Sequence, residues 1–227
     1  MTAALSREGP VDTARTTLLF NDVQNYCATR GGGEYKDLLP AELDAKYGYY
    51  FHELESKVVP NMQRLQSACR KAGIEVMYTV IESLTKDGRD RSLDYKISGL
   101  HVPRGSWDAR VIDAIKPGED EIVIPKTSSS AFISTNIDYV LRNLGTRYLV
   151  ISGVLTDQCV ESAVRDACDL GYLVTIVTDA CAAYDQQRHD AALRAIKGYC
   201  RQRTTAAFIA EISRQPMPGP RDGLLPE

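Results

Sequence analysis

The fold is decided by the stretch Leu149–Gly171, which reads LVISGVLTDQCVESAVRDACDLG. Residues 148–152 predict a buried strand, and residues 157–170 predict a helix that stops at Gly171. Cys159 falls where the intervening turn becomes the first helical turn. Free N–H groups and the positive end of the helix dipole favour a negative charge there, which predicts a reactive thiol with a lowered pKa. The alternative is an ordinary buried cysteine.

Further apolar runs predict that this strand belongs to a parallel sheet. They lie at 16–22, 74–83, 120–126 and 172–181, and a marginal strand is predicted at 199–204. Helices are predicted at 55–72, in the later part of 127–145, at 188–198 and at 205–212. Because strands alternate with helices across short turns, we expect an α/β fold with a parallel sheet.

The remaining segments are predicted to be irregular. Three glycines in 31–35 and the aromatic-rich residues 46–54 favour a loop, with the tyrosines of 47–50 forming a lid or a subunit interface. The polar segment 85–111 has little periodicity, as functional or disordered segments often do. Residues 1–15 form an irregular extension, and the tail 213–227, which is rich in proline and glycine, is expected to pack on a neighbouring subunit.

The composition describes an ordinary soluble globule. The 227 residues suit a single domain, 1–227, with 44% hydrophobic and 25% charged residues and a net charge of -3. This balance gives no reason to expect nucleic acid or a membrane as a partner, and no apolar run approaches the roughly 20 residues of a membrane span. Six scattered cysteines without a C-x-x-C pair favour reduced thiols in the cytoplasm over disulfides or a zinc site.

Three residues at strand ends are candidates for a single site. Asp22 ends the first strand, Lys126 ends the third, and Cys159 follows the fourth. The carboxyl ends of parallel strands share one edge of the sheet, so we expect the three side chains to converge there. Asp22 would take the thiol proton while Lys126 stabilises the negative charge. Taken singly, Asp22 is also explained as a turn residue and Lys126 as a surface charge.

These residues stand within motifs that resemble those of the isochorismatase-like cysteine hydrolases. The motifs are D-x-Q at Asp22–Gln24, K-x-x-x-S-x-F at Lys126–Phe132 and G-V-x-T-x-x-C-V-x-x-x-x-R-D-A at Gly153–Ala167. The likeness runs from about residue 16 to about residue 212 and is strongest to the ureidoacrylate amidohydrolase branch. It is more distant to N-carbamoylsarcosine amidohydrolase, biuret-type hydrolases and nicotinamidases.

The resemblance implies a three-layer αβα sandwich around a six-stranded parallel sheet of Rossmann-like topology. It implies a catalytic triad of Asp22, Lys126 and Cys159, and a cis peptide bond at Val154–Leu155. That bond would aim the Leu155 N–H beside the Cys159 N–H to form an oxyanion hole. The implied partners are a small amide or ureide substrate and further copies of the chain in a dimer or tetramer.

Departures from the family pattern reduce the number of reactions and cofactors that we expect for this chain. Nicotinamidases bind zinc through one Asp and two His after the second strand, whereas this chain has Glu82, Ser83, Asp87 and Asp90 there, so we expect no metal and no cofactor. The family's ether-cleaving isochorismatases lack the cysteine. The candidate substrate-binding residues are Gln24, Asn25, Trp107, Phe132, Tyr184 and Tyr199. Each has a packing role as its alternative, and for Gln24 that role is bracing the sheet edge.

The sequence thus predicts a cysteine amidohydrolase that cleaves the C–N bond of a small ureide, carbamoyl or amide substrate through a thioester. One alternative is an ether hydrolase of the same fold, and another is a binding protein without catalytic activity. A redox thiol protein would need a resolving cysteine near Cys159, and the next cysteine, Cys168, is placed by helical spacing to point elsewhere.

Overall fold

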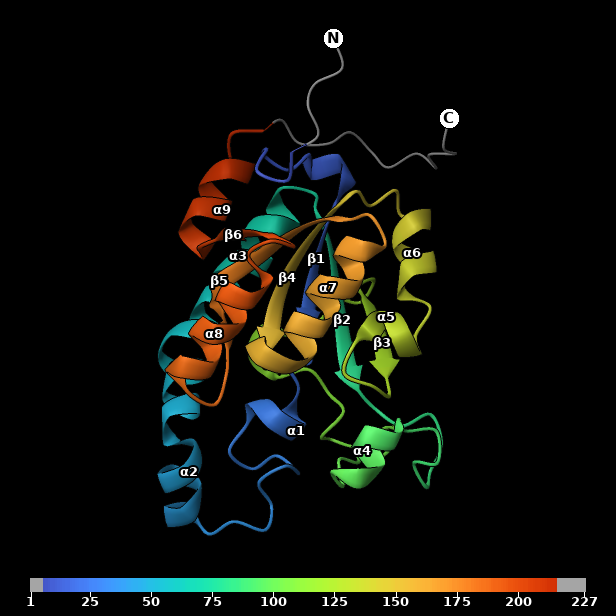
Figure 1. The fold of residues 1–227 in the computed structure, drawn as a ribbon, viewed down its shortest axis with the longest axis vertical. Coiled ribbons are helices and arrows are strands. Elements are labelled where there is room, and N and C mark those ends of the chain that lie inside the picture. The colour runs from blue at the N-terminus through green and yellow to red at the C-terminus, as the bar shows by residue number, and fades with distance from the viewer. Residues whose placement is uncertain (1–5, 216–227) are drawn as a thin grey trace.

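The computed structural model describes residues 6–215, and its centre is a sheet of six strands that pair only in parallel (Figure 1). The strands are β1 (Thr16–Asn21), β2 (Glu75–Ile81), β3 (Ile122–Lys126), β4 (Tyr148–Val154), β5 (Leu173–Ala182) and β6 (Arg201–Arg203). Their order in the sheet is β3-β2-β1-β4-β5-β6. The prediction of six parallel strands, including the marginal sixth, is confirmed.

Helices surround the sheet. The connections between strands contain α1 (Asn25–Ala28), α2 (Pro40–Glu53), α3 (Val59–Lys71), α4 (Leu93–Ile97), α5 (Ala131–Ser134), α6 (Ile137–Asn143), α7 (Glu161–Asp169) and α8 (Gln186–Ile196), and α9 (Thr205–Ile212) follows the last strand. Short 3-10 turns are η1 (Thr13–Arg15) and η3 (Asp113–Ile115), and π-helical turns are η2 (Leu54–Val58) and η4 (Thr156–Val160). None of the helices in residues 6–215 is long and apolar enough to cross a membrane.

The strands bury side chains on both faces, which produces three layers. On β1, Leu18 and Phe20 belong to an apolar cluster shared with α2, α3 and α9, whereas Leu19 belongs to a second cluster shared with α5, α6 and α7. This alternation follows from the two-residue period of a strand. The unbroken apolar run in the sequence therefore reflects burial on both faces, and the three-layer αβα sandwich is confirmed.

The prediction that residues 46–54 form a loop or lid is wrong. Most of them belong to α2, which continues through η2 into α3. Pro40 occupies the first turn of α2, and the Glu42 side chain accepts the Leu39 N–H at 2.9 Å. Tyr50 and Phe51 are fully buried against the core. Tertiary burial of these aromatic side chains outweighs their modest helix propensity, which the local sequence alone does not reveal.

Residues near both ends of the described chain, and the long polar segment, make specific contacts. Of the predicted extension, Val11 and Thr13 are buried, and their N–H groups donate to Glu211 and Gln215. The segment 85–111 contains the short helix α4, whose first turn is capped by the Ser92 hydroxyl. The prediction about the tail 213–227 falls mostly on residues 216–227, which lie outside the described residues.

Candidate active site

The order of the strands creates a switch point between β1 and β4. From β1 the chain crosses to β2 on one side of it, and β4 later pairs with β1 on the other side. Open α/β sheets bind ligands at the carboxyl ends of the strands at such a point. At Gly153 an added Cβ would lie 2.1 Å from the Asn21 carbonyl oxygen, so the two strands can approach this closely only with glycine there. In Figure 1, α1 and α4 lie beneath these strand ends.

The three predicted site residues lie together at this edge. Lys126 Nζ is 2.8 Å from Asp22 Oδ2 and 3.4 Å from Cys159 Sγ. Their exposed fractions are 0% for Lys126, 1% for Asp22 and 6% for Cys159. The cluster therefore joins an ammonium, a carboxylate and a thiol in a desolvated environment, although the residues are far apart in the sequence.

Asp22 is held by the ends of β1 and β2. It has φ of 60°, in the left-handed region that non-glycine residues rarely adopt. Its carboxylate accepts hydrogen bonds from the Thr79 hydroxyl at 3.1 Å and the Asn21 amide at 3.2 Å. Burial raises the pKa of Asp22 above its usual range, although Lys126 acts against that rise. A carboxylate with a raised pKa is a better proton acceptor.

Lys126 remains an ammonium in this position. Burial alone would lower its pKa, but the Asp22 carboxylate and the Cys159 sulfur outweigh burial and raise the pKa above its ordinary value. Its Nζ also donates to the Ser128 carbonyl at 2.7 Å. The fixed positive charge therefore faces both groups between which a proton would move.

Cys159 does not have the lowered pKa that the sequence predicted. Burial raises the pKa of Cys159 to about 12; Lys126 lowers it, and Asp22 adds to the rise. The helix start that was expected to stabilise a thiolate is the π-helical turn η4, and desolvation outweighs the nearby ammonium there. The resting sulfur is thus a thiol, whose hydrogen bond is accepted by Asp22.

Leu155 lies between the end of β4 and the start of η4. Its side chain is buried, and the Val154–Leu155 peptide bond is cis. Its carbonyl oxygen accepts the N–H groups of Gln158 at 3.1 Å and Val160 at 3.3 Å. The turn that carries Cys159 is therefore tied back to the end of β4.

Of the predicted substrate-binding residues, Gln24 uses its side-chain amide for hydrogen bonds with backbone groups. Its amide donates to the carbonyls of Ile81 at 2.9 Å and Asp108 at 3.0 Å, and its oxygen accepts the Ile81 N–H at 2.5 Å. The amide thus braces the edge of the sheet, which was the alternative role. Asn25 donates to the Trp107 carbonyl at 3.0 Å, and Trp107 itself is 50% exposed.

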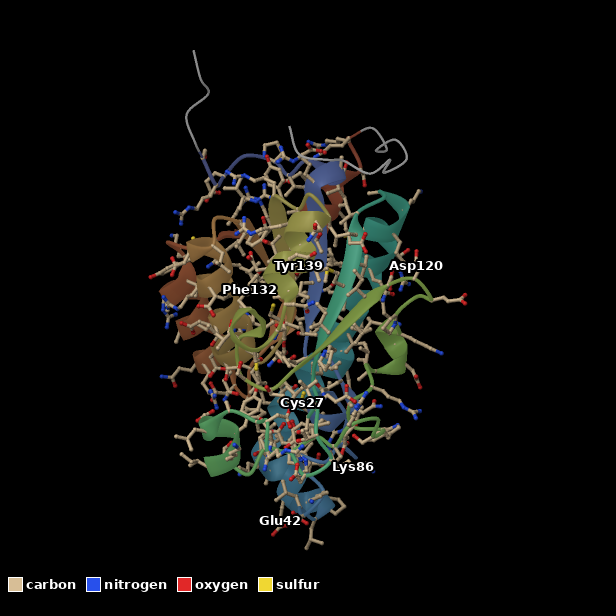
Figure 2. The ribbon with its side chains drawn as sticks, turned by 90° about the vertical axis from the view of Figure 1, so that its right-hand side faces the viewer. Cys27, Glu42, Lys86, Asp120, Phe132 and Tyr139 are labelled. Atoms are coloured by element: carbon tan, nitrogen blue, oxygen red, sulfur yellow. The ribbon has the colours of Figure 1, made fainter. Side chains whose placement is uncertain are left out.

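The aromatic candidates pack into the body of the protein. Phe132 lies 6.0 Å from Tyr172 between ring centroids, and Figure 2 shows it well above Cys27, whose thiol donates to the Asp22 carbonyl at 3.3 Å. Tyr199 lies under the guanidinium of Arg165, 4.7 Å from its carbon to the ring centroid. These contacts are of the packing kind, and a substrate-binding role for Phe132 and Tyr199 stays a prediction.

Tyr184 belongs to an aromatic group above α2. Its ring lies 4.9 Å from Tyr47 and 5.3 Å from Tyr50 between centroids, and its hydroxyl contacts the Glu34 carboxylate. Tyr47 and Tyr50 thus pack against Tyr184 within one chain, whereas Tyr49 is exposed and its hydroxyl donates to Gln186 at 2.7 Å. Its role in substrate binding also stays a prediction.

Tyr95, a residue that sequence reasoning missed, completes the surroundings of the cluster. It lies on α4 and is 3% exposed, with its hydroxyl 3.2 Å from Lys126 Nζ and 3.9 Å from Cys159 Sγ. The only local signal was the length of the polar segment that contains it, because five residues of helix give no periodicity.

The segment after β2 uses its carboxylates for local structure. Glu82 accepts the Gly105 N–H at 2.6 Å, and Asp90 accepts the Leu84 N–H at 2.7 Å. Within residues 6–215, no three His, Cys, Asp or Glu side chains are grouped so that they could hold a metal ion.

The fold and the buried cluster define an α/β protein with a cysteine at the switch point of a doubly wound sheet. The family model of the isochorismatase domain matches residues 16–208. The chain belongs to the isochorismatase family, and it is a hydrolase of that family.

Named relatives are similar in sequence and in structure. Ureidoacrylate amidohydrolase RutB of Rhizobium rhizogenes is 31% identical over 183 residues, which cover 74% of this chain and 70% of that protein. A cysteine hydrolase from Pseudomonas syringae has a TM-score of 0.75 at 24% identity, covering 94% of this chain and 99% of that one. N-carbamoylsarcosine amidase from Thermoplasma acidophilum has a TM-score of 0.62 at 26% identity, covering 84% and 96%.

Proposed function

We propose that the protein is a cysteine amidohydrolase that cleaves the C–N bond of a small ureide, carbamoyl or primary amide substrate. The observation that carries this proposal is the buried contact of Lys126 with both Asp22 and Cys159 at the switch point. The names of the relatives support it, because the similar proteins include an amidohydrolase and an amidase. A homo-oligomeric state and a cytoplasmic location remain predictions.

The first half of the reaction forms a thioester. Asp22 takes the proton of the Cys159 thiol, and the thiolate attacks the carbonyl carbon of the substrate. The C–S bond forms as the carbonyl electrons move to oxygen. When the tetrahedral intermediate collapses, the C–N bond breaks and Asp22 returns the proton to the leaving nitrogen, which departs as ammonia or an amine.

The second half releases the acid. Asp22 takes a proton from a water molecule, whose oxygen attacks the thioester carbonyl. The C–S bond breaks, the sulfur leaves as a thiolate, and the proton on Asp22 restores the thiol. The net reaction consumes one water per C–N bond. Lys126 stays an ammonium throughout and faces a negative charge that alternates between Asp22 and Cys159.

Both tetrahedral intermediates carry an oxyanion that needs hydrogen-bond donors. We assign this role to the backbone N–H groups of Leu155 and Cys159, which flank the turn after β4. Losing one such donor typically costs about 100- to 1000-fold in rate. Asn25 and Trp107, joined at the same edge of the sheet, are the candidates to contact the rest of the substrate.

Replacement of the nucleophile tests the proposal. Cys159→Ala should lower turnover by at least about 1000-fold because it removes the sulfur on which the thioester forms. Ammonia release should be measured over a panel of ureides, carbamoyl amino acids and simple amides.

The matched control is Cys168→Ala, which changes a half-buried cysteine on α7 and should leave turnover unchanged. Ammonia release retained by Cys159→Ala would exclude the thioester route. Failure of the wild-type protein on every C–N substrate, together with an active ether substrate, would favour ether hydrolysis.

A further inference from the structure

Tyr95 lies on α4, and its hydroxyl contacts both Lys126 and Cys159. The backbone N–H of Ser92 donates to the Thr127 carbonyl at 2.9 Å, which ties the start of α4 to the residue after Lys126. The Ser92 hydroxyl in turn accepts the Tyr95 N–H at 3.2 Å. Leu93 and Ile97 on the same helix are 73% and 78% exposed. The helix therefore directs one polar side chain inward, toward the reacting sulfur.

The hydrogens of Lys126 determine the direction of the Tyr95 hydroxyl. The ammonium has three N–H donors and no acceptor. Its two shortest contacts, with Asp22 at 2.8 Å and the Ser128 carbonyl at 2.7 Å, take two of them. The Tyr95 oxygen, at 3.2 Å from Nζ, and Cys159 Sγ, at 3.4 Å, share the third. The phenol hydrogen cannot point back at an ammonium, so it is free for another acceptor.

The acceptor within reach is the sulfur of Cys159. Sγ lies 3.9 Å from the Tyr95 oxygen, within the range of hydrogen bonds that involve sulfur. The resting thiol donates a hydrogen bond to Asp22 and keeps its proton. The sulfur lone pairs can therefore accept a hydrogen bond from the phenol. A hydrogen bond to sulfur strengthens when the sulfur becomes anionic.

We propose that Tyr95 is a fourth catalytic residue of the site, which donates a hydrogen bond to Cys159 and stabilises the thiolate as Asp22 takes its proton. This inference rests on the proposed function, because it assigns Tyr95 a role in the same reaction. The hydrogen bond lowers the pKa of Cys159 against the larger opposing effect of burial. Tyr95 thus offsets part of the cost of making an anion in a dry site.

A purely structural role for Tyr95 makes a different prediction. The ring belongs to the apolar cluster of α2 and α3, and it lies 5.8 Å from Lys126 Nζ at its centroid. Phenylalanine would keep both the packing and the contact of the ring with the ammonium. Tyr95→Phe therefore removes only the hydroxyl, and a structural role would leave the reactivity of Cys159 unchanged.

The test is the alkylation rate of Cys159, which needs no substrate. Iodoacetamide and the smaller reagent methyl methanethiosulfonate both react with thiolates, and mass spectrometry assigns the label to each cysteine. We expect Tyr95→Phe to slow both reactions at Cys159 by the same factor of about ten, the size of one hydrogen bond to a charged group. The rate at Cys168 should stay unchanged.

Matched variants exclude indirect effects. Tyr139→Phe removes the hydroxyl of a tyrosine on α6 that is 70% exposed, and Cys159 should then react at the wild-type rate. Ser92→Ala keeps the phenol but loosens the turn that holds it, so Cys159 should slow by a smaller factor than in Tyr95→Phe. This second variant decides the question if Tyr95→Phe does not fold.

Several results would overturn the proposal. One is a rate at Cys159 in Tyr95→Phe that equals or exceeds that of the wild type. Another is a loss that differs between the two reagents, because changed access affects a large and a small reagent unequally. Absence of turnover on all C–N substrates with a slowed Cys159 would count against the proposed function alone, since alkylation reports the sulfur directly.

Discussion

Two ion pairs with buried cations lie at the two opposite edges of the sheet, and they have different roles. Lys126, the last residue of β3, pairs with Asp22, and Arg201, the first residue of β6, pairs with Glu211. The side chains of the two cations are 0% and 1% exposed. The two cations are thus equally buried, so burial of the cation by itself does not distinguish a functional pair from a structural one.

The neighbours of the two cations differ. Arg201 donates to Thr175 at 3.1 Å, to the Gly9 carbonyl at 2.8 Å, and with two nitrogens to Glu211 at 3.0 Å. Its partners join the start of the described chain, β5 and α9. None of them is a nucleophile. These hydrogen bonds give the Arg201 pair a structural role, in which it holds three segments together.

Lys126 instead contacts groups that can exchange protons. Beside Asp22 it reaches the thiol of Cys159 and the phenol of Tyr95. Burial raises the pKa of Asp22 and of Cys159, and the Lys126 ammonium acts against both rises, so the anionic form of each group depends on the same cation. A buried pair indicates chemistry when ionisable neighbours surround it, and structure when backbone groups do.

The largest expected effect is on activity. Asp22→Asn should lower turnover by about 1000-fold or more, because an amide cannot accept the proton of Cys159, and general acid–base groups contribute up to about 10⁴-fold. Ammonia release on the substrate found for the wild type measures the loss. Asp138→Asn, which alters an exposed pair with Arg142 on α6, should remain within twofold. Equal losses in both variants would remove the distinction between Asp22 and a surface carboxylate.

The next expected effect is a loss of stability with no change in turnover. Arg201→Met should lower the free energy of unfolding by about 3 kcal/mol, because it leaves the Glu211 carboxylate half-buried without its cation. Urea denaturation measures this change, and turnover of the folded protein should match the wild type. Glu211→Gln keeps an oxygen acceptor but leaves the buried Arg201 guanidinium without its anion, so it should also lower the free energy of unfolding by about 3 kcal/mol and leave turnover unchanged. A loss of turnover in folded Arg201→Met would contradict the purely structural role of this pair.

The last prediction concerns the pH dependence of thiol reactivity. Because burial raises the pKa of Cys159 to about 12, its alkylation by iodoacetamide should rise by about tenfold per pH unit between pH 7 and 10. The raised pKa of Lys126 means that its stabilisation is fully present below its unfolded value of 10.5 and is lost only as the pH rises above it. The fold should therefore keep this pair over the measured range. A plateau in the rate below pH 9 would show that the thiolate already predominates.

Local pattern predicted much of the fold because each element carries its own period. The bounds of α9, residues 205–212, were predicted without error, and β1 to β5 were found within a few residues. The failure at α2 has a physical cause, since clustered tyrosines have no strong helical preference and become helical when they pack on the sheet. The burial of Arg201 has no local signal for a similar reason, because its partner Glu211 lies on another element.

The sequence by itself determined which side chains follow the strands, and therefore that Asp22, Lys126 and Cys159 share one edge. That conclusion needs only the apolar runs and the parallel order that alternating elements impose. The tertiary structure alone decided that Tyr95 faces the sulfur and that the Cys159 thiol keeps its proton at rest. Both depend on how completely water is excluded around the cluster, and solvent exclusion is a property of packed layers that no single segment of sequence contains.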